Sequence, residues 1–496
     1  MRVILFLLVS TIWHQQITCT LAKDIAADDY LTMADESLSQ GLNEKAIGLY
    51  ENGISVLGDN ESVLTVMSLE TNLASALSAV GRNEESVKSY RKAILAYKAH
   101  IDDIDDPETI SYAKDIASTA SFYMGMVYQD MSEAQKAVDA YGYTYVLDPK
   151  HWASMANLAS VLHDQLKLHD DALDAYNKAY EILTQTEYEP TDPPTEPKLV
   201  LSQLQYRIGL CLSYNLDRQC ALSDDPDMKP VSCKEMATHA FSLAIQFDDR
   251  NESAKHMLAT ITADATMKRA SNEYIKNLFD DYAQNFEHSL VEELGYTGYE
   301  KLRRGFDRAL GDKVEPFSVV VDAGCGTGLV GEQFRNVSSH LIGVDLSQAI
   351  LDEAEKMRPG LYDERIAADV MEVFRQRKPI SLIVAADSYI YFGDLQPLFE
   401  AMVEGLADDG IAAFTLENVD SESEETLTET KPDWRWQLTA SGRFAHRKQY
   451  VESVAANVGL EVIHNEIMDG FRHEHGKDVR GNMFIMKKVS KTEQEL

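Results

Sequence analysis

The sequence predicts a multidomain protein, in which an all-α helical repeat array is followed by an α/β domain with a mostly parallel sheet. The chain has 496 residues, which is more than one hydrophobic core of about 100 to 200 residues can hold. From 24 to 264, small and aromatic residues recur at helical spacings. From 270 to 490, short apolar runs alternate with amphipathic stretches, as strands and helices do in parallel sheets.

The composition is that of an acidic globular protein. Lys and Arg number 46 against 81 Asp and Glu, which gives a formal charge of -35. Such a surface repels phosphates and gains no counterion release, so we expect no nucleic-acid partner. The charge instead favours solubility.

Both ends of the chain carry targeting signals. Arg2, the apolar run that follows it and the small residues near Ala22 predict a signal peptide over 1–22. The tail 491–496 ends in Glu-Gln-Glu-Leu, which resembles an endoplasmic reticulum retrieval signal in its last two residues. We therefore expect the secretory pathway, with the ER lumen as the candidate compartment, and a cytoplasmic protein if the signal is not used. We expect no stable membrane span.

Cysteines are too few and too scattered for a disulfide-built fold. Cys220 and Cys233 bracket a polar insertion near 215–231. A disulfide that pins this loop and a pair of free thiols both remain open.

The N-terminal segment is typical of stacked helix pairs. In its clearest unit, Gly125 and Tyr128 lie on one helix, Ala137 and Tyr141 on the next, and Pro149 closes the unit. Two antiparallel helices approach closely only where small residues face each other, and an aromatic side chain fills the wedge between units. Small and aromatic residues four apart recur at Ala46 and Tyr50, Ser86 and Tyr90, Ala172 and Tyr176, and Ala237 and Phe241.

This pattern resembles the tetratricopeptide repeat, with a fifth unit that includes Gly209 and Leu212. Stacked helix pairs commonly present a concave surface to peptides or proteins, so we expect this half to bind a protein or peptide partner. A generic helical bundle, or a role in self-association, is the alternative.

The C-terminal half begins with a glycine-rich loop after its first predicted strand. The loop reads Asp-Ala-Gly-Cys-Gly-Thr-Gly over 322–328, and Asp345 ends the next predicted strand. The carboxylate of Asp322 would repel the phosphates of a dinucleotide, since two like charges about 4 Å apart near a protein surface cost on the order of 4 kcal/mol. S-adenosylmethionine carries an ammonium and a sulfonium but no phosphate, and Asp345 can accept hydrogen bonds from its ribose. A glycine-rich turn without this aspartate would suit a dinucleotide equally well.

The loop resembles the first motif of class I methyltransferases, and the chain from about 25 to 488 is similar to predicted tetratricopeptide-repeat methyltransferases. The segment 274–286 resembles their helical lid, and the loops near 368–370 and 386–389 resemble their later motifs. The resemblance implies a Rossmann-like class I methyltransferase domain with a seven-stranded sheet and S-adenosyl-L-methionine as cofactor. The implied cofactor-binding residues are Asp322, Ala323, Gly324, Gly326, Gly328, Asp345, Leu346, Asp369, Val370, Asp387 and Tyr282. Asp369 also has the position of a helix cap.

Direct methyl transfer needs a positioned nucleophile, and a base only if that nucleophile arrives protonated. His446 is the first candidate base and Glu417 the second. Arg443, His446 and Tyr450 would share a face and bind a substrate group if their segment is helical, although Gly442 offers a turn instead.

We expect His473 and His475 to be loop or surface residues, and we predict no metal site. The acceptor is a protein or a small molecule. The competing functions are a non-catalytic scaffold with a relic methyltransferase fold, and an oxidoreductase.

Overall fold

The computed structural model describes residues 26–58, 61–185, 196–220, 231–283, 286–311, 315–419, 421–474 and 477–489. The predicted signal peptide, most of the insertion near 215–231 and the tail 491–496 lie outside these residues. The chain divides into two compact units, and the boundary falls after Arg250.

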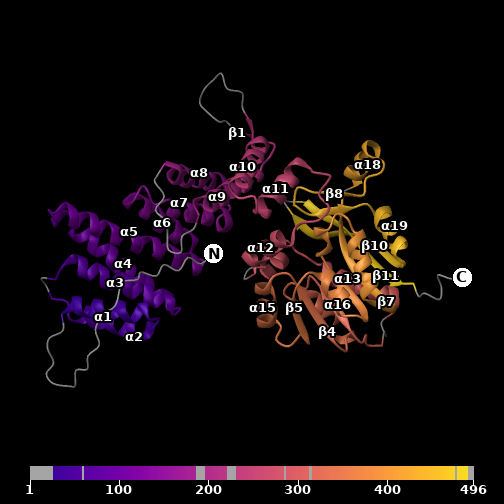
Figure 1. Ribbon diagram of the computed structural model, residues 1–496, viewed down its shortest axis with the longest axis horizontal. Helices are drawn as coiled ribbons and strands as arrows, with labels where there is room; N and C mark the ends of the chain where they lie inside the picture. Colours follow the sequence, from indigo (N-terminus) through magenta and orange to yellow (C-terminus); the bar gives the residue numbers. More distant parts are fainter. Residues whose placement is uncertain are drawn as a thin grey trace. The chain divides into compact units, whose positions relative to one another are not determined.

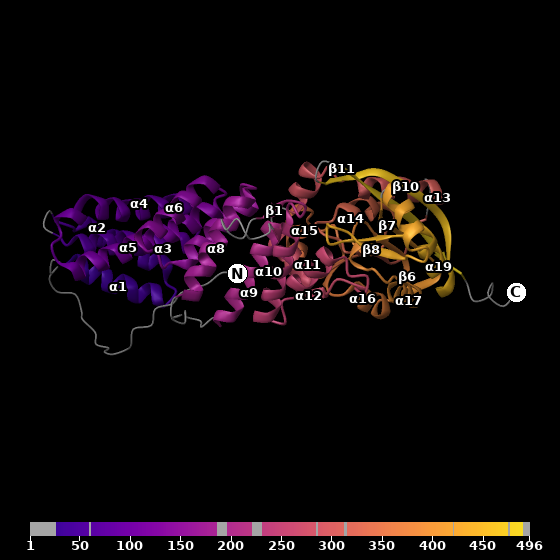
Figure 2. The same cartoon turned by 90° about the horizontal axis from the view of Figure 1, so that it is seen from above.

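The first unit is a run of antiparallel helices that pack side by side in sequence order (Figures 1 and 2). These helices are α1 (Ala27–Ser39), α2 (Asn43–Ser55), α3 (Val63–Ala79), α4 (Asn83–His100), α5 (Pro107–Asp130), α6 (Ala134–Leu147), α7 (Trp152–Ser160), α8 (His169–Gln185), α9 (Pro197–Ser213) and α10 (Cys233–Phe247).

The small residues of the predicted repeats have the packing role expected of them. A Cβ atom at Gly125 of α5 would lie 2.7 Å from the ring of Tyr141 in α6. At Gly209 of α9, a Cβ atom would lie 2.5 Å from the ring of Phe241 in α10. The aromatic ring therefore rests directly on the backbone of the neighbouring helix. An N-terminal helical region is confirmed, and its assignment to tetratricopeptide repeats stays a prediction.

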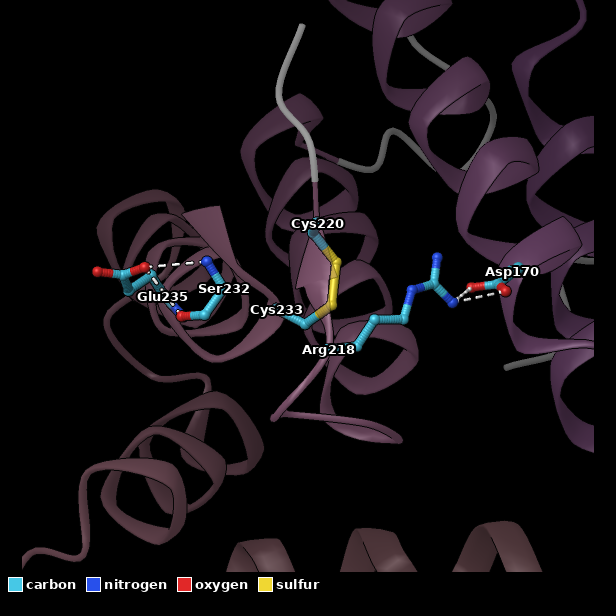
Figure 3. Close-up of a disulfide and its surroundings, with 6 residues drawn as sticks. All are labelled: Asp170, Arg218, Cys220, Ser232, Cys233 and Glu235. Atoms are coloured by element: carbon cyan, nitrogen blue, oxygen red, sulfur yellow. Dashed lines mark hydrogen bonds and ion pairs between the residues drawn. A yellow bond between two sulfur atoms is a disulfide. The ribbon is translucent and has the colours of Figure 1, made fainter. Parts of the chain in front are cut away.

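A disulfide joins Cys220 in β1 (Gln219–Cys220) to Cys233 at the start of α10, with an S–S distance of 2.05 Å (Figure 3). Strand β1 pairs with β2 (Val231–Ser232). Ser232 caps α10 by accepting a hydrogen bond from the backbone N–H of Glu235 at 3.2 Å. Of the two states left open for these cysteines, the structure contains the disulfide.

The second unit begins with α11 (Glu252–Thr262), a helix expected among the repeats from its sequence. The His256 ring of α11 stacks on Tyr274 with ring centroids 4.0 Å apart, and its Nε2 lies 2.7 Å from the carbonyl oxygen of Gly442. Because these contacts tie α11 to the α/β fold, the compact units divide before this helix.

The α/β fold of the second unit confirms the predicted alternation of strands and helices (Figure 1). Its strands are β3 (Val320–Ala323), β4 (Leu341–Asp345), β5 (Glu364–Ala367), β6 (Ile380–Ala385), β7 (Leu406–Asn418), β8 (Trp436–Leu438), β9 (Phe444–His446), β10 (Leu460–Glu474) and β11 (Lys477–Lys488). Its remaining helices are α12 (Asn272–Tyr282), α13 (Gly298–Leu310), α14 (Leu329–Phe334), α15 (Gln348–Met357), α16 (Val370–Gln376), α17 (Gln396–Gly405), α18 (Ser421–Thr430) and α19 (Lys448–Val458).

The main sheet has the order β10-β11-β7-β6-β3-β4-β5, and the β8–β9 hairpin joins it beside β7. Strands β7, β6, β3, β4 and β5 are parallel, and β11 is antiparallel to both of its neighbours. The predicted seven-stranded, mostly parallel sheet is thus present, with the hairpin added. The carboxyl ends of β3, β4, β5, β6 and β7 meet at one edge, where ligands of such sheets bind.

A hydrophobic layer covers each face of the sheet. Phe374, Phe399 and Val454, from α16, α17 and α19, pack on one face. Phe306 of α13 and Phe334 of α14 pack on the other. All five side chains are buried. The two layers fix the strands, so the loops at the carboxyl edge project from a rigid base. Within the described ranges, no helix is long and apolar enough to cross a bilayer.

Candidate functional site

The glycine-rich loop between β3 and α14 makes the tight turn that its sequence predicts. Gly324, Gly326 and Gly328 have φ angles of +73°, +54° and +102°, a region that side chains with a Cβ rarely adopt. A Cβ atom at Gly324 would lie 2.3 Å from the Cβ of Ser388, in the loop after β6. The Ser388 hydroxyl donates a hydrogen bond to the carbonyl of Ala323 at 2.7 Å. The loops after β3 and β6 are therefore in direct contact.

Asp322, at the end of β3, lies beneath this loop and not at its surface. Its exposed fraction is 0%, and its Oδ2 accepts a hydrogen bond from the Tyr362 hydroxyl at 2.7 Å. Burial raises the pKa of Asp322 to about 7, although the Tyr362 bond opposes the shift. Its Oδ1 is also buried and has no hydrogen-bond partner among the described residues.

Asp345, at the end of β4, links two loops. Its Oδ2 accepts a hydrogen bond from the Gly326 N–H at 3.1 Å, and its Oδ1 accepts one from the Ser347 N–H at 3.0 Å. Burial raises its pKa. Leu346 is partly buried and packs against a hydrophobic cluster that includes Ile275 of α12 and Tyr391. The structure thus brings Asp345 to the glycine loop, as predicted.

Helix α12 lies over the loops after β4 and β5. The Ser347 hydroxyl donates a hydrogen bond to Asp280 of α12. Asp369, after β5, accepts hydrogen bonds from Arg269 at 2.6 Å and from Asn272 at 3.0 Å. Tyr282, the predicted lid residue, ends α12 and is 49% exposed.

Asp369 is the N-cap of α16, where its Oδ1 accepts a hydrogen bond from the Met371 N–H at 2.8 Å. Burial raises its pKa, but the hydrogen bond and charge of Arg269 outweigh this effect and hold the pKa below the usual value. Val370 packs on the core cluster beneath the sheet edge. The capping role considered for Asp369 is therefore present, together with an ion pair.

Glu287 forms a group of hydrogen bonds across the glycine-rich loop. This carboxylate accepts hydrogen bonds from Arg358 at 2.7 and 3.0 Å and from the Thr327 hydroxyl at 2.5 Å. Arg358 also pairs with Glu332 at 3.0 Å. Arg358, a cation close to the loop, was not predicted from the sequence, and the carboxylates of Glu287 and Glu332 balance its charge.

Three charged side chains meet at the carboxyl ends of β6 and β7. Arg472 of β10 donates hydrogen bonds to Asp387 and, at 2.7 Å, to Glu417. Asp387 has a φ of +59°, and its backbone N–H donates to the Thr415 hydroxyl at 2.9 Å. Burial raises the pKa of Glu417, and the positive charge of Arg472 offsets part of this rise. Asp387 and Glu417 were predicted as site residues from the sequence, whereas Arg472 was not.

His446, the first candidate base, is in the core. It lies on β9, is 1% exposed, and its Nε2 is 3.2 Å from the carbonyl oxygen of Gly393. Burial lowers its pKa to about 4, so the ring is neutral at neutral pH. This geometry supports a packing role more than proton exchange with a substrate.

Of the two arrangements considered for Arg443, His446 and Tyr450, the structure has the turn at Gly442 and not the shared helical face. Gly442 has a φ of +77° and forms the turn, Phe444–His446 is strand β9, and Tyr450 lies on α19. Phe444 is fully buried, which favours the strand over a helical face. The Tyr450 hydroxyl accepts a hydrogen bond from the Leu395 N–H at 2.9 Å and donates one to Asp394 at 3.1 Å. Its contacts are therefore structural, and Arg443 shares no helix with it.

Of the two histidines near the β10–β11 turn, the structure describes His473. The His473 side chain is 56% exposed and its Nδ1 lies 3.0 Å from Asp478, and His475 lies outside the described residues. Over the ranges given above, no group of three or more His, Cys, Asp or Glu side chains could hold a metal ion.

The fold and this loop cluster define a Rossmann-like α/β domain with its ligand edge at the glycine-rich loop. Residues 295–465 match the sequence model of a family described as a methyltransferase domain. The second unit therefore carries a methyltransferase domain.

Individual proteins resemble the chain over limited stretches. The 18S rRNA (guanine-N(7))-methyltransferase of Bos taurus is 29% identical over 126 residues, which cover 22% of this chain and 42% of that protein. Magnesium protoporphyrin IX methyltransferase from Synechocystis PCC 6803 is similar at 11% identity and a TM-score of 0.33, over 44% of this chain and 99% of the other. An S-adenosylmethionine-dependent methyltransferase from Clostridium acetobutylicum is similar at 17% identity and a TM-score of 0.31, over 43% of this chain and 100% of the other. The chain thus spans less than half of its bovine relative.

Proposed function

We propose that the chain is an S-adenosylmethionine-dependent methyltransferase that transfers a methyl group directly to an acceptor. The observation that carries this proposal is the cradle after β3, where glycines with positive φ lie between the buried carboxylates of Asp322 and Asp345. Such a cradle fits a cationic nucleoside without phosphates better than a dinucleotide. The methyltransferase match over 295–465 supports the same conclusion.

The residues that would hold the cofactor follow from these contacts. The backbone of the glycine loop lets a ligand approach closely, and Asp345 offers carboxylate oxygens for a ribose. The cofactor supplies an electrophilic methyl group on a sulfonium. The protein orients the two partners, and positioning of this kind contributes up to about 7 to 11 kcal/mol in ideal systems.

Calorimetry on the full chain tests the proposal. We expect binding of S-adenosylmethionine and S-adenosylhomocysteine, and none of NAD. Absence of binding to both adenosyl ligands would leave a scaffold with a relic fold. Tight NAD binding would instead support an oxidoreductase.

A matched pair of glycine variants locates the site. Gly326→Ala places a Cβ atom 3.1 Å from the ring of Phe286, whereas Gly360→Ala, at a similar φ of +71°, meets open space. Both substitutions carry the same kind of backbone strain, of order 1 to 3 kcal/mol. We expect Gly326→Ala to weaken S-adenosylhomocysteine binding at least about tenfold, which corresponds to about 1.4 kcal/mol, and Gly360→Ala to leave it unchanged. Equal effects would place the ligand elsewhere.

We also propose that the helical first unit recruits a protein or peptide partner or substrate. Its paired helices provide the stacked surface on which such partners commonly bind. Transfer of tritiated methyl groups into fractionated lysate tests this point. Label in proteins supports it, and label confined to small molecules would remove the protein acceptor.

The secretory pathway is the compartment that we propose. The predicted signal peptide and the Cys220–Cys233 disulfide both favour an oxidising lumen. Antibody staining of the untagged protein should coincide with an ER lumen marker, and a diffuse cytosolic signal would contradict the assignment.

A further inference from the structure

Three Asn-x-Ser sequons, at Asn60, Asn251 and Asn336, take no part in the proposed methyl transfer. Such a sequence is an acceptor for N-glycosylation in the secretory pathway when x is not proline, and here x is Glu or Val. Chance also produces sequons in a chain of this length, so the motif alone does not select a site. The surroundings of each asparagine do, since a glycan needs a side chain that reaches water in the folded protein.

Asn336 lies in the short 3-10 turn 335–337 between α14 and β4, and it is exposed. Its Oδ1 accepts a hydrogen bond from the guanidinium of Arg303 at 2.9 Å, and its Nδ2 makes no hydrogen bond with the described residues. An N-linked glycan is attached to Nδ2, whereas the amide oxygen is retained. The contact that orients Asn336 is therefore compatible with a glycan on the same side chain.

The turn that carries Asn336 is held firmly on the side of the following residues. Val337 is 7% exposed and belongs to the hydrophobic cluster on this face of the sheet. Its carbonyl accepts a hydrogen bond from the Phe317 N–H at 2.8 Å, and the Ser338 hydroxyl donates one to the carbonyl of Phe334 at 2.7 Å. The middle residue of the sequon is thus in the core, while the asparagine before it is at the surface.

Asn251 has the opposite environment. It is 7% exposed and is the N-cap of α11, where its Oδ1 accepts a hydrogen bond from the Ala254 N–H at 2.9 Å. A glycan on this side chain would displace the groups that bury it and would disturb the cap. A chain that is glycosylated at Asn251 is therefore incompatible with the fold of α11. Asn60 lies outside the described residues.

Asn336 and the glycine-rich loop lie at opposite ends of β4. The strand begins at Leu341, shortly after the turn, and ends at Asp345, which accepts a hydrogen bond from the glycine-rich loop. Because β3 and β4 are parallel, the turn lies at the amino edge of the sheet, whereas the proposed cofactor site lies at the carboxyl edge. A glycan on Asn336 is thus attached away from the ligand edge.

We propose that Asn336 carries an N-linked glycan and that Asn251 carries none. The proposal rests on the proposed secretory compartment, where the sugar donor is a lipid-diphosphate-linked oligosaccharide. Nδ2 of Asn336 forms a bond to the anomeric carbon of this donor, and the bond from that carbon to the diphosphate oxygen breaks with its electrons on oxygen. The amide gives up one proton. The Ser338 hydroxyl that the sequon requires is buried in the folded protein, so transfer precedes the folding of this turn.

Enzymatic removal of the glycan locates the modified residue. The full chain is produced with its own N-terminal segment in eukaryotic cells, and peptide-N-glycosidase F converts each glycosylated asparagine to aspartate. Peptide mass spectrometry should then find Asp at position 336 and Asn at position 251. Unmodified Asn at position 336 in a chain recovered from the ER lumen would overturn the proposal alone. A chain that fractionates with the cytosol would remove the glycan and the proposed compartment together.

Matched variants test the same assignment by gel mobility. Asn336→Gln should migrate faster by one glycan, whereas Asn251→Gln should migrate as the unaltered chain does, and the reverse result would overturn the proposal. Ser338→Ala removes the sequon but keeps Asn336 and its Arg303 contact, so it should also lose the glycan, while Ser338→Thr should keep it. If a variant does not fold, mass spectrometry of the unaltered chain still decides.

The position of the glycan is tested with the unaltered chain. Removal of the glycan should change the affinity for S-adenosylhomocysteine, measured by calorimetry, less than about threefold. A larger change would contradict a glycan that is attached away from the ligand edge.

Discussion

At the scale of single residues, Asp322 illustrates how burial changes the meaning of a sequence motif. The acid before the glycines was expected to oppose a diphosphate and to bind the cofactor, and it lies under the loop with Tyr362. Tyr362 occupies space left by two glycines, because Cβ atoms at Gly331 and Gly343 would lie 2.5 and 3.0 Å from its hydroxyl and ring. Asp322 therefore supports the loop and also contributes a buried charge that depends on pH.

This charge predicts proton release when the cofactor binds. With a pKa of about 7, Asp322 is partly protonated at neutral pH. A cationic ligand nearby stabilises the carboxylate and lowers its pKa, so binding releases protons and affinity rises with pH from about 6 to 8. Calorimetry in two buffers of different ionisation enthalpy measures the released protons. Asp322→Asn should abolish the release, and proton uptake by the unaltered protein would contradict this reasoning.

At the scale of elements, the sequence predicted best where local chemistry decides the structure. The strand before the glycine loop, the turn itself and Asp369 as the helix cap of α16 follow from apolar runs, glycines and capping residues. The sequence left a helix and a turn both open around His446, because spacings of three and four also fit a short strand that leads into a helix. Arg472 could not be foreseen, since its partners Asp387 and Glu417 lie far away in the sequence.

Helix α12 is the element whose attachment we can test. Arg269 and Asp369 are 26% and 14% exposed at their side chains, so water screens their ion pair only in part. A hydrogen bond to a charged group contributes about 1.5 to 3 kcal/mol, and about 1.4 kcal/mol is a factor of ten. We expect Arg269→Ala to speed amide hydrogen exchange in α12 about tenfold or more. Arg304→Ala, which removes an exposed pair with Glu300 on α13, is the control and should leave α12 unchanged.

At the scale of the whole molecule, the chain has two compact units with separate cores. Tyr90 and Tyr141 belong to a hydrophobic cluster within the first unit, whereas Phe399 and Phe414 belong to one within the second. Composition and the change of pattern near residue 264 predicted two parts. The exact boundary was not predictable, because α11 has the sequence of a repeat helix but packs on the α/β domain.

Separate cores predict separate responses to a disulfide and to a ligand. The Cys220–Cys233 bond lies in the first unit and closes a loop with a sequence separation of 13 residues. Its loss in the Cys220→Ser, Cys233→Ser double variant should lower the free energy of unfolding of that unit by about 2 to 4 kcal/mol. S-adenosylhomocysteine should stabilise only the second unit. Differential scanning calorimetry should therefore show one transition that the double variant lowers and another that the ligand raises. Reductant should reproduce the variant's shift in the unaltered protein and have no effect on the variant. If ligand and variant shift the same single transition, the two units unfold together and their cores are energetically coupled.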